Sequence, residues 1–240
     1  MISKNVLQSV ISKYYLNGLN NQVKWRIKDN TLTIYAGEKG RVCMVELNDF
    51  SLADGELGVF DTNKLNKLVN IMNGDLLLTI EKMKTISTKM HIADSNFDLT
   101  YSLADPLILP KTTWYEDPEQ YEIELNLSQE DVEYLIKAKS ALADVDNMLI
   151  TTTSDFDDNN ICEFIFGDNT GFSNKITYQA QGKILKDDIN LPFNSSIFKD
   201  ILNANKDMDG ATLQISIKGM MKLVFQSENI NSYYYIARNE

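Results

Sequence analysis

Residue types that usually carry chemistry are scarce in this sequence of 240 residues, which has one histidine and two cysteines. A lone His91 on an alternating segment is more often structural than catalytic, and no Ser-His-Asp or Cys-His arrangement can be built around it. Cys43 and Cys162 lie far apart in predicted strands. This position favours small buried side chains in a reducing compartment over a disulfide or a zinc site. We therefore expect a protein without enzymatic activity.

Long apolar runs and glycine signatures are also missing. No stretch approaches the ~18 consecutive apolar residues that crossing a bilayer requires. Residues 1–13 carry a helical apolar pattern, without the continuous apolar region and small-residue cleavage site of a signal peptide. The 11 glycines form neither a dinucleotide fingerprint nor a Walker loop. We expect a soluble protein of the cytoplasm that needs no cofactor.

One acidic segment begins like a calcium-binding loop, with Asp155, Asp157 and Asp158 followed by two asparagines. The sixth position of the pattern is Asn160 rather than glycine, and the twelfth is Phe166 rather than glutamate, so the pattern fails. Aspartate and asparagine are common in turns. The segment is therefore predicted to be a hairpin turn with no bound metal.

The two halves of the chain repeat one order of elements. Apolar residues at helical spacing predict helices over residues 3–15 and 61–73 in the first half, and over 128–142 and 194–208 in the second. Ser128 and Asp131 resemble a capping box. The duplication predicts an α+β architecture in which two similar domains each pack two amphipathic helices on antiparallel sheets. Strands expected in the second half include residues 148–153, 161–166, 173–180 and 182–189.

Three of the four prolines lie between the halves, at positions 106, 110 and 118. Proline cannot donate a hydrogen bond to a sheet, so this segment is predicted to run extended as a connector over residues 106–119. It separates an N-terminal domain of residues 1–105 from a C-terminal domain of residues 120–240. The connector also contains two large aromatic residues, Trp114 and Tyr115, which a simple linker would not be expected to have.

Charge is unevenly distributed. The net charge of −11 and the pI near 4.6 argue against a protein that coats nucleic acid with its whole surface. Lysines nevertheless outnumber acidic residues in the predicted helices, for which we expect a net charge of +5. On one helix such lysines would merely keep the surface soluble. On four helices they predict a basic face that contacts DNA phosphates without reading bases, formed by Lys4, Lys13, Lys64, Lys67, Lys137, Lys139, Lys199 and Lys206.

Several stretches carry a resemblance to one family of proteins: residues 59–72, 93–94, 104–106, 127–151 and 231–237. Through them the whole chain resembles the trimeric sliding clamps of T-even-like bacteriophages, the DNA polymerase processivity factors. The resemblance implies the DNA-clamp fold and a homotrimeric ring of three protomers joined head to tail, with helices lining a hole for duplex DNA. It also implies loading by a clamp loader ATPase, tethering of the DNA polymerase through a C-terminal peptide, and a location in the host cell cytoplasm.

The family places a basic residue on a lining helix at the position of Lys137. The other lysines are assigned from helix polarity, and Lys139 falls beside Val132, toward the apolar side of its helix. A head-to-tail ring needs one edge strand from each domain. By analogy the subunit interface consists of Phe97, Leu99, Tyr101, Leu103, Lys175, Ile176, Tyr178 and Ala180. The implied partner pocket lies between the domains near Leu107, Ile108, Leu109, Tyr233, Tyr234 and Tyr235, and Trp114 and Tyr115 set it apart from the family's pocket.

Two other functions remain open at this point. A carboxylate-dependent metal nuclease could use Asp155 and Asp157, or Asp144 and Asp146, if two or more of these carboxylates converge in a pocket. A two-domain, β-rich viral structural or interaction protein would explain the strands and the acidity. It would not explain four amphipathic helices that carry lysines.

Overall fold

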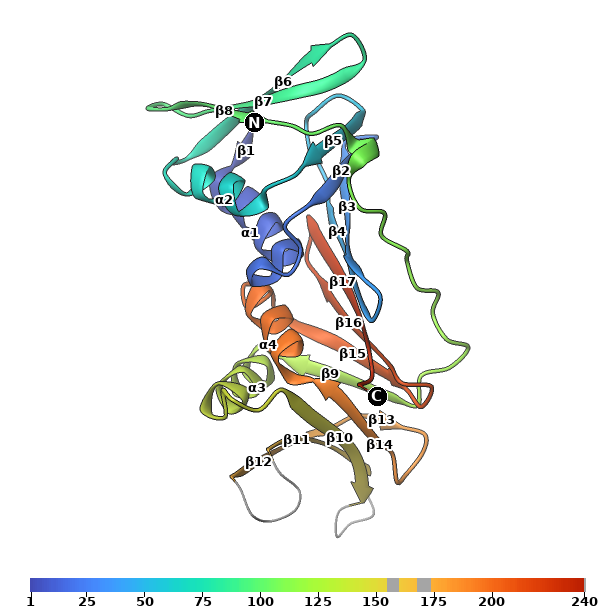
Figure 1. The fold of residues 1–240 in the computed structure, drawn as a ribbon. Coiled ribbons are helices and arrows are strands. Elements are labelled where there is room, and N and C mark those ends of the chain that lie inside the picture. Colours follow the sequence, from blue (N-terminus) through green and yellow to red (C-terminus); the bar gives the residue numbers. More distant parts are fainter. Residues whose placement is uncertain (155–159, 168–173, 240) are drawn as a thin grey trace. The chain divides into compact units, whose positions relative to one another are not determined.

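The structure is a computed structural model that describes residues 1–154, 160–167 and 174–239 (Figure 1). The chain divides into two compact units, one formed by Met1–Trp114 and Glu228–Ser232 and the other by Tyr115–Ser227 and Tyr233–Glu240. The boundary between Trp114 and Tyr115 falls within the predicted connector. Among the described residues, no helix is both long and apolar enough to span a bilayer.

The first unit contains two α-helices between and beside short strands. Its elements are β1 (Ile2–Ser3), α1 (Lys4–Tyr15), a 3-10 turn (Leu16–Gly18), β2 (Val23–Lys28), β3 (Thr31–Glu38), β4 (Arg41–Leu47), β5 (Gly55–Val59), α2 (Thr62–Asn70), β6 (Asp75–Met83), β7 (Ile86–Ala93), β8 (Asp98–Ser102) and a second 3-10 turn (Pro106–Ile108).

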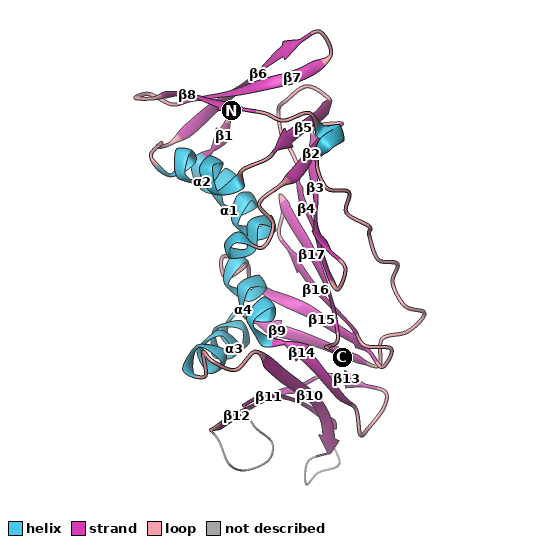
Figure 2. Ribbon diagram, in the orientation of Figure 1, coloured by secondary structure: helices cyan, strands magenta, loops and turns pink. Residues whose placement is uncertain are grey.

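Two antiparallel sheets and both helices enclose the core of the first unit. The strand order is β1-β6-β7-β8 in one sheet, while the other contains β4-β3-β2-β5. Trp25 of β2 is fully buried and meets Tyr14 and Phe50 edge-on, with ring centroids 6.4 and 6.3 Å apart. α1 and α2 lie next to each other on one side of the sheets (Figure 2).

The second unit repeats the plan. Its elements are β9 (Ile123–Ser128), α3 (Gln129–Ala141), β10 (Asn147–Ser154), β11 (Asn160–Gly167), β12 (Lys175–Gln181), β13 (Lys183–Ile184), β14 (Asn190–Asn194), α4 (Ser195–Ala204), β15 (Gly210–Ser216), β16 (Met220–Gln226) and β17 (Ile230–Ala237), whose first residues belong to the first unit.

Aromatic side chains fill the core between the sheets and helices of the second unit. One sheet has the order β12-β11-β10-β14, and the other contains β13-β9-β15-β16-β17. Phe164 of β11 stacks on Phe198 of α4 with centroids 6.0 Å apart, and Phe225 meets Tyr234 edge-on at 6.0 Å. α3 and α4 again lie beside each other on one side (Figure 2). The α+β class predicted from the sequence is confirmed.

Side-chain caps begin three of the four helices. At α2, the Asp61 carboxylate accepts a hydrogen bond from the backbone three residues later at 3.0 Å, and at α4 Asn194 does the same at 2.8 Å. At α3, Asp131 N–H donates to the Ser128 hydroxyl at 3.2 Å while Ser128 N–H donates to the Asp131 carboxylate at 2.7 Å. The predicted capping box is therefore confirmed, and these caps explain why the helices begin where they do.

The strand predictions need correction at two points. The strand expected over residues 182–189 is reduced to β13, Lys183–Ile184, because Asp188 adopts a positive φ of 55° that interrupts an extended chain. Strands β5, β7, β9, β14 and β16 were not predicted from the sequence. In β5, two of the five residues are glycines, which weaken the sequence signal of a strand, yet β5 pairs with β2 through Leu57 opposite Trp25.

Candidate nucleic-acid interface and free sheet edges

The basic surface of the first unit lies mainly on α2. Lys64 and Lys67 are exposed, whereas Leu65 and Val69 on the opposite side of the helix are buried. The helix contains no acidic residue, so its exposed charge is positive. Lys4 is partly buried, and its ammonium donates to the carbonyl of Asn70 at 2.9 Å, at the end of α2. Lys4 therefore stabilises the negative end of the neighbouring helix dipole.

Most of the predicted lysines of the second unit are less available to a ligand, because they are paired or at least partly buried. Lys137 is exposed, but its ammonium pairs with Glu133 at 3.2 Å and lies 5.4 Å from the centre of the Tyr134 ring. Such an exposed pair one helical turn apart contributes only about 0.3–0.5 kcal/mol, so Lys137 can leave it to meet another anion. Lys199 is partly buried on α4, and Lys206 is exposed just beyond the end of that helix.

Two lysines predicted to face DNA are buried instead. Lys13 is 0% exposed and Lys139 is 3% exposed. The Lys139 ammonium donates to the carbonyls of Ala143 at 2.9 Å and Leu142 at 3.3 Å, at the end of α3. A cation in this position satisfies helix-end carbonyls that would otherwise lack partners. The prediction that these two lysines lie on an exposed DNA-facing surface is therefore wrong.

The excess of positive charge on the helices is smaller than predicted. With the observed helix ends, the four helices carry seven lysines and four acidic residues, a net charge of +3 rather than +5. Lys206 lies outside α4. The expected value of +5 also left out Asp61, Glu133 and Asp207, which lie within the predicted ranges, and Glu133 lies inside α3. Three of the four acidic residues, Glu130, Asp131 and Glu133, are on α3. The residues outside the four helices carry a net charge of −14, which with the +3 of the helices gives the total of −11. Positive charge is therefore still concentrated on the helices, but less strongly than predicted.

Strand β8 is a free edge of its sheet, because it pairs with β7 on one side and no strand within residues 1–154, 160–167 and 174–239 pairs with its other side. The amide of Leu103 donates to the carbonyl of Thr88, and the amide of Asp94 donates to the carbonyl of Phe97, both at 2.9 Å. Hydrogen bonds alternate along an antiparallel pair. The backbones of residues 97, 99, 101 and 103 therefore point to β7, and those of Asp98, Thr100 and Ser102 point to the free edge.

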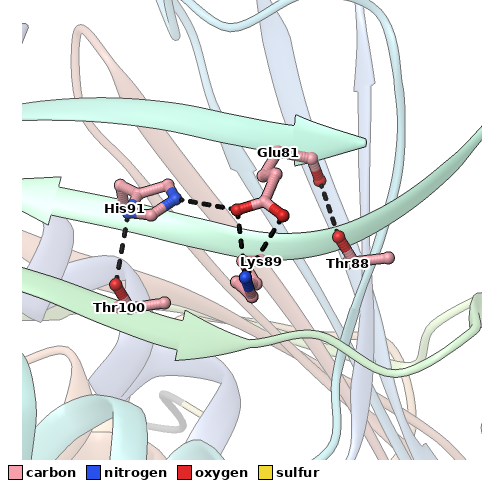
Figure 3. A network of polar contacts seen from close by, with 5 residues as sticks. All are labelled: Glu81, Thr88, Lys89, His91 and Thr100. Carbon is pink, nitrogen blue, oxygen red and sulfur yellow. Dashed lines mark hydrogen bonds and ion pairs between the residues drawn. The ribbon is translucent and has the colours of Figure 1, made fainter. Parts of the chain in front are cut away.

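A polar network fixes the outward face of this sheet beside the edge (Figure 3). The Glu81 carboxylate accepts from the Lys89 ammonium at 3.2 Å and lies 3.4 Å from His91 Nε2. His91 Nδ1 is 3.2 Å from the hydroxyl of Thr100, and Thr88 donates to the Glu81 carbonyl. Hydrogen bonds from Lys89 and then His91 hold the pKa of the Glu81 carboxyl below its usual range. His91 here orients polar groups on a sheet surface.

The inward side of the β8 edge is aromatic. The side chain of Tyr101 is 2% exposed, and its hydroxyl donates to the carbonyl of Asp61 at 3.0 Å. Burial raises the pKa of Tyr101. Phe60 stacks on Tyr101 with centroids 6.0 Å apart and stays partly exposed, as does Phe97. Tyr101, predicted as an interface residue, offers neither a free side chain nor a free backbone there, whereas Phe60, which was not predicted, is accessible.

Strand β12 is one edge of the corresponding sheet in the second unit, and among the described residues it pairs with β11 alone. The Tyr178 hydroxyl donates to the carboxylate of Asp131, the residue that also caps α3. Burial would raise the pKa of Asp131, but hydrogen bonds from Ser128 and Tyr178 lower it overall. Tyr134 of α3 is 45% exposed, and its ring centre is 6.2 Å from that of Tyr178. The edge strand and the start of α3 therefore form one connected surface.

The residues predicted to form a partner pocket, three in the connector and three on β17, divide into exposed and buried groups. In the first unit, Leu107 and Ile108 are 83% and 76% exposed, while Leu109 is buried, with its side chain against Gly58. In the second unit, Tyr234 is fully buried and its hydroxyl accepts from Asn205 at 2.8 Å. Tyr235 is 4% exposed, and Tyr233 is partly exposed. Leu109, Tyr234 and Tyr235 are therefore core residues rather than an open pocket lining.

Asp117 anchors the connector to the second unit. Its carboxylate accepts hydrogen bonds from Tyr121 at 3.0 Å, from Lys222 at 2.6 Å, and from Tyr235. The Lys222 ammonium also lies over the Tyr235 ring, 5.4 Å from its centre. Burial would raise the pKa of Asp117, but these donors together hold it below its ordinary value of 3.8. The ionised carboxylate is thus the form that the fold favours.

Replacing Asp117 by asparagine should lower the free energy of unfolding at pH 7 by about 1 kcal/mol, a modest value because the carboxylate is half exposed. The pKa of Asp117 is lowered by folding, so its contribution is complete above 3.8 and is lost as the pH falls through the lower folded value. Urea unfolding of both proteins at pH 7 and pH 3 measures this difference. A difference that stays constant between the two pH values would contradict the assignment.

The carboxylates of the nuclease alternative do not form a site in the part of the chain described. Asp144 and Asp146 are exposed, and Asp146 accepts a hydrogen bond from Ser196 at 3.3 Å. Asp155 and Asp157, and with them the predicted hairpin turn, lie outside the described residues. Among residues 1–154, 160–167 and 174–239, no three His, Cys, Asp or Glu side chains converge to hold a metal ion. Cys43 and Cys162 are both buried, and burial raises the pKa of each thiol to about 12.

Comparison with known proteins finds similarity in solved structures alone. No family model and no curated protein matches the sequence. The chain is similar in structure to the Proliferating Cellular Nuclear Antigen (PCNA) of Entamoeba histolytica, with 14% identity, a TM-score of 0.75, and coverage of 99% of this chain and 96% of that one. It is also similar to A. fulgidus PCNA, solved with the C-terminal region of FEN-1 bound, with 12% identity, a TM-score of 0.76, and coverage of 100% and 97%. The likeness confirms the predicted clamp fold over the whole chain.

Proposed function

We propose that this chain is a sliding clamp, which closes as a homotrimer around duplex DNA and tethers the replicative DNA polymerase and other factors to it. The observation that carries the proposal is a full-length clamp fold with two unlike free edges, β8 in one unit and β12 in the other. The clamp acts without a catalytic step or a cofactor, and a clamp loader ATPase opens it. The T-even-like bacteriophage type remains our proposal from the sequence resemblance.

The ring forms when β8 of one copy pairs with β12 of the next. Because the two edges differ, the contact is head to tail, and repetition closes a ring when the rotation between copies allows it. The unpaired backbone groups of Asp98, Thr100 and Ser102 supply the hydrogen bonds. Phe60 and Phe97 beside one edge, and Tyr134 and Tyr178 beside the other, supply apolar area that a junction would remove from water.

The DNA backbone contacts the helices of each unit. Of the eight lysines predicted, Lys64, Lys67, Lys137 and Lys206 are exposed, and Lys4 and Lys199 are partly buried. Lysines that meet phosphates give attraction that depends on salt and ignores sequence. Few such contacts on a chain of net charge −11 would bind DNA weakly. Closure of the ring keeps DNA by topology, and weak contacts then permit sliding.

Partners contact the connector. Leu107 and Ile108 are two large apolar side chains exposed side by side, an arrangement that commonly marks a protein interaction site. The similar A. fulgidus PCNA is described with the C-terminal region of FEN-1 bound. By analogy, we infer that the DNA polymerase and other replication factors present a peptide to this part of the chain.

Light scattering after size-exclusion chromatography tests the ring directly. We expect a particle of three 27.3 kDa chains, and negative-stain images should show a closed ring with a central hole. The particle should stay on nicked circular DNA and leave the same DNA after it is cut to a linear form, because only a threaded ring distinguishes the two. A protein that is monomeric at all accessible concentrations, or that is retained equally on the circular and the linear DNA, would contradict the proposal.

A further inference from the structure

A cavity lies on the outer face of the first unit, away from its helices. Its volume is about 240 Å³, and it is bounded by two neighbouring strands and by the connector. The pairing of β2 with β3 sets Lys24 opposite Tyr35, while Trp25 and Ile34 point to the buried side. The connector closes the cavity, and the Thr112 hydroxyl donates to the carbonyl of Tyr35 at 3.5 Å. The lining residues are Lys24, Arg26, Tyr35, Pro110, Lys111 and Thr112.

The cavity is positively charged within an acidic protein. Glu56 of β5 accepts from Lys24 at 3.3 Å and from Arg26 Nε at 3.1 Å. Burial would raise the pKa of Glu56, but hydrogen bonds from Lys24 and Arg26 lower it overall, so it is ionised and fixes both cations on the strand surface. The lining contains three cations, Lys24, Arg26 and Lys111, and Glu56 pairs with the first two. The local excess of positive charge contrasts with the net charge of −11 for the chain.

Two of the cations keep capacity for a ligand. The Arg26 side chain is 55% exposed and meets Glu56 through Nε, and a guanidinium has further N–H donors on its other nitrogens. Lys111 is exposed and has no hydrogen bond or ion pair with any residue that the structure describes. A carboxylate placed between Arg26 and Lys111 would form charge-assisted hydrogen bonds, which are about twice as strong as neutral ones.

The shape of the cavity suits a peptide better than a small ion. A volume of about 240 Å³ is several times the ~30 Å³ that one water molecule occupies in the liquid. Tyr35 meets Trp114 edge-on with ring centroids 5.5 Å apart, so one wall is aromatic. The amides of Lys111, Thr112 and Thr113 make no hydrogen bond with the described part of the chain. An extended peptide can pair with such a segment through its own backbone.

We propose that this cavity binds an acidic peptide segment of a partner protein, with one or two carboxylates at Arg26 and Lys111 and a neighbouring side chain against Tyr35. The site lies on the first unit alone, and it requires neither ring assembly nor DNA. Its lining does not include the exposed Leu107 and Ile108, and its recognition is electrostatic rather than apolar. An acidic partner can therefore dock on a protein whose overall charge repels it.

Tryptophan fluorescence offers a direct test, because Trp114 borders the site while Trp25, the other tryptophan, is buried in the core. We expect hexaglutamate to change the emission of the full-length protein at low salt, and the Trp114→Phe variant to lose the change. Lys111→Glu should weaken binding about tenfold or more. The matched control is Lys84→Glu, which makes the same charge change at an exposed position outside the cavity and should bind as the parent does.

Three results would overturn the proposal. Hexaglutamate could leave the Trp114 emission unchanged at low salt, or it could bind the Lys111→Glu and Lys84→Glu variants equally, which would mean nonspecific attraction. Inorganic phosphate could displace the peptide at an equal concentration of charge, which would mean a site for small anions only. Because the assay involves neither DNA nor assembly, its failure would leave the clamp proposal standing, and failure of the clamp proposal would leave this one standing.

Discussion

The Thr100→Pro variant should be a folded monomer. The amide of Thr100 points to the free edge of β8, so proline there removes no hydrogen bond from the pairing with β7. Between copies the effect is large, because proline removes a donor and places its ring in the path of the incoming strand. We expect the dissociation constant of each junction to rise about 100-fold, for a cost of about 3 kcal/mol at each junction. Light scattering over a concentration series measures it.

The matched control is Thr100→Val, which loses the hydroxyl near His91 but keeps the backbone donor and a β-branched side chain. It should assemble as the parent does. Circular dichroism and the melting temperature should be close to the parent values for both variants at concentrations where all are monomeric. A Thr100→Pro protein that remains trimeric would show that β8 is not the strand used at the junction.

The elements recognised from sequence were those whose pattern is local. The capping box of Ser128 and Asp131 and the apolar face of α3 are complete within one segment, and both were predicted. β5 depends on its neighbours, since Gly55 and Gly58 have no side chain to give a strand pattern. Gly58 is required by packing, because a Cβ there would lie 2.3 Å from the carbonyl oxygen of Ala104. That constraint joins residues 46 positions apart and is invisible locally.

The candidate site was predicted less well, because exposure depends on contacts that a helical pattern does not contain. Lys139 was already on the apolar side of α3 by spacing, and its ammonium is held by carbonyls at the helix end. Tyr178 and Asp131 are joined across 47 residues by a hydrogen bond. Alternation along β8 identified its two faces, but which backbone groups are free depends on the register with β7. Charge sign could be read from sequence; charge accessibility could not.

The second large effect concerns DNA. We expect the combined substitutions Lys64→Glu, Lys67→Glu and Lys137→Glu to weaken the salt-sensitive attraction between the protein and DNA, while leaving the trimer and its topological retention on nicked circular DNA intact. All three side chains are exposed, so each change reverses a charge without opening the core. The logarithm of the association constant for DNA falls linearly with the logarithm of the salt concentration. Every phosphate contact that is lost should make this slope less steep by about 0.9. Affinity at 0.1 M salt should fall at least about tenfold.

The control carries Lys82→Glu, Lys84→Glu and Lys186→Glu, three exposed lysines outside the helices that change the net charge by the same amount. If repulsion by overall charge were the cause, both triple variants would lose DNA equally. If the helices contact the phosphates, the helix variant alone should lose the salt-dependent term, because screening confines such contacts to about 10 Å at 0.1 M salt. Equal behaviour of the two variants would therefore remove the helices from the DNA surface, even if the ring itself were established.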